Sequence, residues 1–187
     1  SSLAAMDGSL VVRSVREGES GWSFAHPTMI DAYADRLREP EMLHFFVEGF
    51  GVDVLLDQTT CGDVEYENTI VLPRALWPRV MARLEEPTSG DRWISRSRRL
   101  SYIANQTTAE FQRLWVANNL DLLEAYAVPG LMLDAVPEND FICRLFATGV
   151  LPEAIRSTFA NYLIEYCISG VDGAVMWQSN LRGLLND

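Results

Sequence analysis

Apolar residues recur with a helical period along most of this chain. In the run from Leu76 to Leu84 they fall at i, i+1, i+4, i+5 and i+8, which places them on one face of a helix. Pro, Gly and Asn residues interrupt such runs at short intervals. The pattern predicts helices over residues 28–37, 42–49, 51–59, 76–84, 91–105, 108–117, 120–127, 137–148 and 152–167.

Strand signals are few and lie mostly near the start of the chain. Leu10–Val15 and Trp22–Phe24 flank a turn-forming stretch at Glu17–Gly21, which predicts a short hairpin. Thr69–Leu72 is read as an isolated short strand, after an acidic, turn-rich stretch at 61–68. We therefore expect a mainly α fold, in which a short β-hairpin is followed by an antiparallel helical bundle or a short α-solenoid.

A Pro-Thr-Ser-Gly stretch at 87–90 is the strongest internal boundary signal. It divides the chain into residues 1–87, a hairpin with a helical subdomain, and residues 88–187, a C-terminal helical subdomain. Each part is long enough to contribute to a core but small for an independent domain. We expect two subdomains that share an interface.

Composition narrows the classes of function. The 187 residues carry a net charge of −11, and all fifteen basic residues are arginine, so no lysine can serve a P-loop or a Schiff base. An acidic chain is poorly suited to nucleic acid, and no apolar run approaches the ~20 residues that span a membrane. The odd set Cys61, Cys143 and Cys167 lacks metal-ligand spacing and predicts reduced, mostly buried thiols in a cytoplasmic protein without a metal.

Charged side chains suggest one candidate binding surface. Arg92, Arg96 and Arg99 share a helix face and could meet an acidic partner, although a merely solvated face fits the same spacing. A loose acidic group is interpreted as solvated helical surface: Asp121, Glu124, Asp134, Glu138 and Asp140.

His26 lies at the corner between the second strand and the helix predicted over 28–37. Its supporting residues are Trp22, Phe24, Pro27 and Thr28. An imidazole at a helix N-terminus is placed either to cap the turn or to meet an anion such as a phosphate. The residues alone leave both readings open.

Several short motifs resemble one known family. Asp7-Gly-Ser-Leu-Val, the run from Trp22 to Ala32 and Pro40-Glu-Met-Leu are similar to the end of the winged-helix region in STAND NTPases, above all the bacterial novel STAND class of phage-defence signalling ATPases. Leu100-Ser-Tyr, Asn119-Leu-Asp-Leu-Leu and Gly149-Val-Leu-Pro-Glu-x-x-Arg156 resemble the helical region that follows.

The resemblance implies a role for His26. A Phe-x-His element of the family, similar to Phe24-Ala25-His26, is taken to sense the β-phosphate of ADP and to keep the molecule closed. This chain departs from the family because it has no Walker A loop, no Walker B strand and no first winged-helix segments. It therefore looks like a C-terminal piece or a relic without the motor, with ADP or ATP bound only alongside a missing NTPase domain.

Three functions follow as hypotheses. The first is a non-catalytic regulatory and interaction module of a STAND-type signalling NTPase in antiviral defence, whose partner is another protein or the rest of a longer chain. The second is a self-standing acidic helical adaptor, and the third is an enzyme that uses His26 with Asp31 or Asp35 as a general base. Under the first two hypotheses the chain is not an enzyme. All three leave its oligomeric state open.

Overall fold

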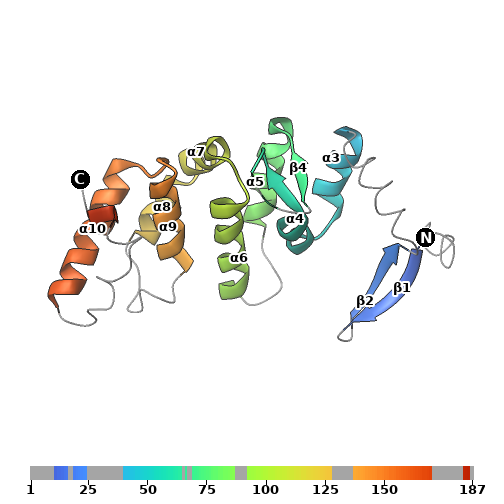
Figure 1. The fold of residues 1–187 in the computed structure, drawn as a ribbon, viewed down its shortest axis with the longest axis horizontal. Helices are drawn as coiled ribbons and strands as arrows, with labels where there is room; N and C mark the ends of the chain where they lie inside the picture. The colour runs from blue at the N-terminus through green and yellow to red at the C-terminus, as the bar shows by residue number, and fades with distance from the viewer. Residues whose placement is uncertain are drawn as a thin grey trace. The chain divides into compact units, whose positions relative to one another are not determined.

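A computed structural model describes residues 11–16, 19–24, 40–64, 66, 69–86, 92–127, 137–169 and 183–185, with the backbone alone for residues 11–16, 19–24, 40 and 92. The chain forms two compact units, Ser1–Phe50 and Gly51–Asp187. Their elements are labelled in Figure 1. This division falls at a different place from the predicted boundary at residues 87 and 88, and the predicted linker at 87–90 lies outside the described residues.

The first unit contains the predicted strand pair. Strands β1 (Val11–Arg16) and β2 (Glu19–Phe24) run antiparallel, with Val11 opposite Phe24 and Arg16 opposite Glu19. Helix α3 (Pro40–Gly49) follows and ends at the glycine where the sequence predicts its end. The helix predicted over 28–37 lies outside the described residues.

The second unit is helical for most of its described length, which confirms the mainly α prediction. Helices α6 and α9 pack against each other, α6 also contacts α4, and α8 contacts both α7 and α9. The elements are α4 (Val52–Gln58), the 3-10 turn η1 (Arg74–Leu76), α5 (Trp77–Glu85), α6 (Arg92–Asn105), α7 (Ala109–Asn118), α8 (Leu120–Tyr126), α9 (Pro137–Ala147) and α10 (Glu153–Ile168).

A small sheet in this unit corrects the sequence analysis. Strand β4 (Ile70–Leu72) was expected to stand alone, but it pairs in parallel with β3 (Thr59–Cys61), a stretch read as the end of a helix and the start of a turn. The Cys61 amide donates to the Gln106 carbonyl, and the Cys61 carbonyl accepts from the Thr108 amide. Backbone partners about 45 residues away in sequence therefore hold β3 extended. The local sequence pattern does not predict these contacts.

Edge-to-face aromatic pairs join the helices in the core. The rings of Trp77 and Phe111 lie 5.6 Å apart between α5 and α7, and those of Trp115 and Phe141 lie 5.3 Å apart between α7 and α9. All four side chains are buried. On α4, Leu55 and Leu56 are buried, whereas Val54 is 40% exposed.

Two glycines adopt the left-handed backbone conformation and fix turns. Gly149 (φ 67°) ends α9, and the amide of Val150 reaches back to the Leu145 carbonyl at 2.9 Å, as in a Schellman motif. Gly62 (φ 86°) follows β3, and a Cβ there would lie 2.6 Å from Cγ2 of Thr108. Both turns thus need glycine for its backbone, and Gly62 also for the space.

Candidate functional site

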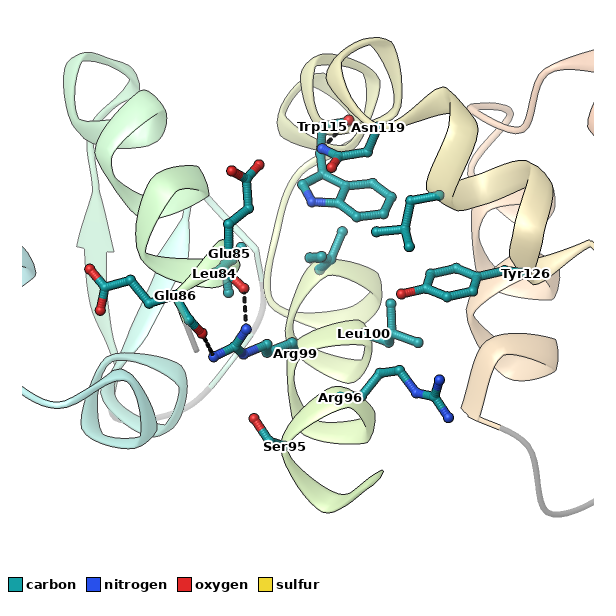
Figure 2. Close-up of a pocket in the computed structure, with 12 residues that line it drawn as sticks. Leu84, Glu85, Glu86, Ser95, Arg96, Arg99, Leu100, Trp115, Asn119 and Tyr126 are labelled. Carbon is teal, nitrogen blue, oxygen red and sulfur yellow. Dashed lines mark hydrogen bonds between the residues drawn. The ribbon is translucent and has the colours of Figure 1, made fainter. Parts of the chain in front are cut away.

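A surface groove in the second unit gathers arginine, tyrosine and tryptophan side chains (Figure 2). It has a volume of about 520 Å³ and lies between the end of α5, one face of α6 and the helices α7 and α8. Its lining residues are Leu84, Glu85, Glu86, Ser95, Arg96, Arg99, Leu100, Ile103, Trp115, Asn119, Leu122 and Tyr126.

The floor of the groove is apolar and fixed by core packing. Leu100, Ile103 and Trp115 are each less than 5% exposed, and the Trp115 ring is held edge-on against Phe141. Leu122, on α8, is 42% exposed at the groove wall. A ligand would therefore meet a rigid floor and one accessible aliphatic side chain.

Arg99 closes the end of helix α5. Its Nη1 donates to the Leu84 carbonyl and its Nη2 to the Glu86 carbonyl, both at 2.5 Å, as Figure 2 shows. These carbonyls end a helix and lack intrahelical partners, so a cation there is favourable. The Glu86 carboxylate is instead bound by Arg83 at 2.9 Å.

Arg96 points to the other side of the groove and forms an asymmetric ion pair. Its Nε lies 2.8 Å from Oε1 of Glu138, and Arg96 is 47% exposed while the Glu138 side chain is only 6% exposed. The second carboxylate oxygen of Glu138, Oε2, is buried without a hydrogen-bond partner. Among the described residues, Glu138 is the ion-pair partner of Arg96, and the pair is made through Nε.

Tyr126 supplies a hydroxyl group to the same groove. Burial raises the pKa of Tyr126, Glu138 adds to the rise, and the positive charge of Arg96 opposes it. Figure 2 shows the Tyr126 ring reaching into the groove toward Leu100. Because its pKa is raised, the hydroxyl is protonated at neutral pH and able to donate to a ligand.

The lining of the groove offers few groups for catalysis. Among its described lining residues there is no histidine or cysteine. A smaller groove of about 370 Å³ also borders α5 and is lined by Trp77, Pro78, Met81 and Leu114 among others. Arg74 at its edge pairs with Glu110 at 2.9 Å. Across the described ranges, no three His, Cys, Asp or Glu residues gather to hold a metal ion.

A buried chain of hydroxyl and thiol groups lies beside the small sheet. Thr59 Oγ1 donates to the Leu55 carbonyl at 2.7 Å, so the Tyr102 hydroxyl, 2.9 Å away, must donate to Thr59. Cys61 Sγ lies 3.4 Å from the Tyr102 oxygen and donates to it in turn. Burial raises the pKa of Cys61 to about 12. The thiol is therefore protonated and structural, and Cys61 and Cys143 are free and buried as predicted.

The residues singled out from the sequence have mixed outcomes. His26, Pro27 and Thr28 lie outside the described residues, as do the side chains of Trp22, Phe24 and Arg92, so their predicted roles stay predictions. Arg96 and Arg99 do share a helix, but they turn to different partners, Glu138 on α9 and the carbonyls of α5.

One sequence interpretation is wrong. Glu138 was grouped with solvated acidic residues, yet it is buried in the first turn of α9 against Arg96. Trp115 and Tyr126 were not singled out at all. Their only signal is that each is an aromatic residue in a predicted helix, which does not distinguish a groove from a core.

The comparisons with known proteins add no family. No family model, curated protein or solved structure matches this chain. No described helix is both long enough and apolar enough to cross a membrane.

Proposed function

We propose that this chain is a non-catalytic interaction module that binds a partner protein. The observation that carries the proposal is the groove of Figure 2, where arginine and tyrosine side chains lie beside a buried apolar floor. Interfaces favour arginine, tyrosine and tryptophan at their centres, and all three line this groove.

The resemblance to STAND NTPases extends the proposal. In that reading the module belongs to a signalling ATPase of antiviral defence, and His26 contacts the nucleotide of an NTPase domain that this chain lacks. The groove then serves the regulatory side of the protein. The extension rests on the short motifs around His26, whereas the interaction module rests on the groove.

Site-specific photo-cross-linking in the native host tests the proposal. A benzoylphenylalanine placed at Leu122 in the groove should capture a defined protein or a defined segment of the parent chain. The matched control is Ile168, which is apolar and 81% exposed on α10 but lines neither groove described above. The proposal fails if position 122 captures nothing, or captures the same mixture as position 168.

A further inference from the structure

We draw no further inference here: the strongest candidate, the groove between α5, α6, α7 and α8, belongs to the site already described, and the two glutamates beside two arginines in its lining select no one class of ligand.

Discussion

The buried hydrogen-bond chain Cys61–Tyr102–Thr59–Leu55 allows a prediction about stability. Which of two substitutions costs more depends on which atom donates each hydrogen bond. Tyr102→Phe removes a hydroxyl but leaves the Thr59 proton on the Leu55 carbonyl, so of this chain only the weak S–H donor of Cys61 loses its acceptor. Thr59→Val leaves the Tyr102 hydroxyl without its acceptor and removes the side-chain donor to Leu55. The cysteine sulfur, 3.4 Å from Tyr102, is too weak an acceptor to compensate fully.

The groups that lose a partner determine how much unfolding free energy each variant loses. A neutral hydrogen bond is worth about 1 kcal/mol, so Tyr102→Phe should lower the free energy of unfolding by about that much. An unsatisfied buried group costs about 1–3 kcal/mol, so Thr59→Val should cost about 2 kcal/mol. The double variant no longer contains the orphaned hydroxyl. Its loss of unfolding free energy should therefore be about 1 kcal/mol smaller than the sum of the two single losses.

Urea unfolding, followed by tryptophan fluorescence, measures the free energy of unfolding of the wild-type chain, the two single variants and the double variant. The value is taken from the midpoint and the slope of each transition. The proton assignment is refuted if the two single costs add within about 0.5 kcal/mol, or if Tyr102→Phe is the more damaging change.

The remaining predictions concern turns, thiols and nucleotide. Gly149→Ala should cost about 1–2 kcal/mol for its left-handed backbone, and Gly62→Ala should cost more because its Cβ meets Thr108, in the same urea assay. Iodoacetamide at pH 8 should label Cys167 well before Cys61, as read by peptide mass spectrometry; equal rates would contradict the burial. Because the pKa of Cys61 rises from 9.0 to about 12 on folding, the unfolded chain loses that proton first, and unfolding free energy should fall with pH across that window. In a parent ATPase, His26→Ala should loosen ADP about 10- to 150-fold by calorimetry, and unchanged affinity would make His26 structural.

Much of the helical architecture could be predicted because it is written in local spacing. The apolar period places α6, α7 and α10 within a residue or so of their observed bounds, and α3 ends at Gly49 as expected. The parallel pairing of Thr59–Cys61 could not be predicted, because it depends on backbone partners at Gln106 and Thr108. Residues without a distinctive local pattern take their structure from such distant contacts.

The groove shows the same limit for side chains. The spacing of Arg96 and Arg99 correctly places them on one helix. It does not predict that each side chain contacts a different neighbour. Burial of Glu138 follows from the packing of α9 on α6, which a charge count along one helix does not contain. The aromatic residues become recognisable as a site only when α7 and α8 bring them to the face of α6 (Figure 2).

The central claim, that the groove is a protein-binding site, is tested most directly by calorimetry with the segment recovered from the cross-link at position 122. The account predicts saturable binding of that segment to the purified chain, weakened about tenfold or more by Arg96→Gln and left intact by Arg113→Gln. No measurable binding, or equal affinity in the wild-type and Arg96→Gln chains, would contradict it.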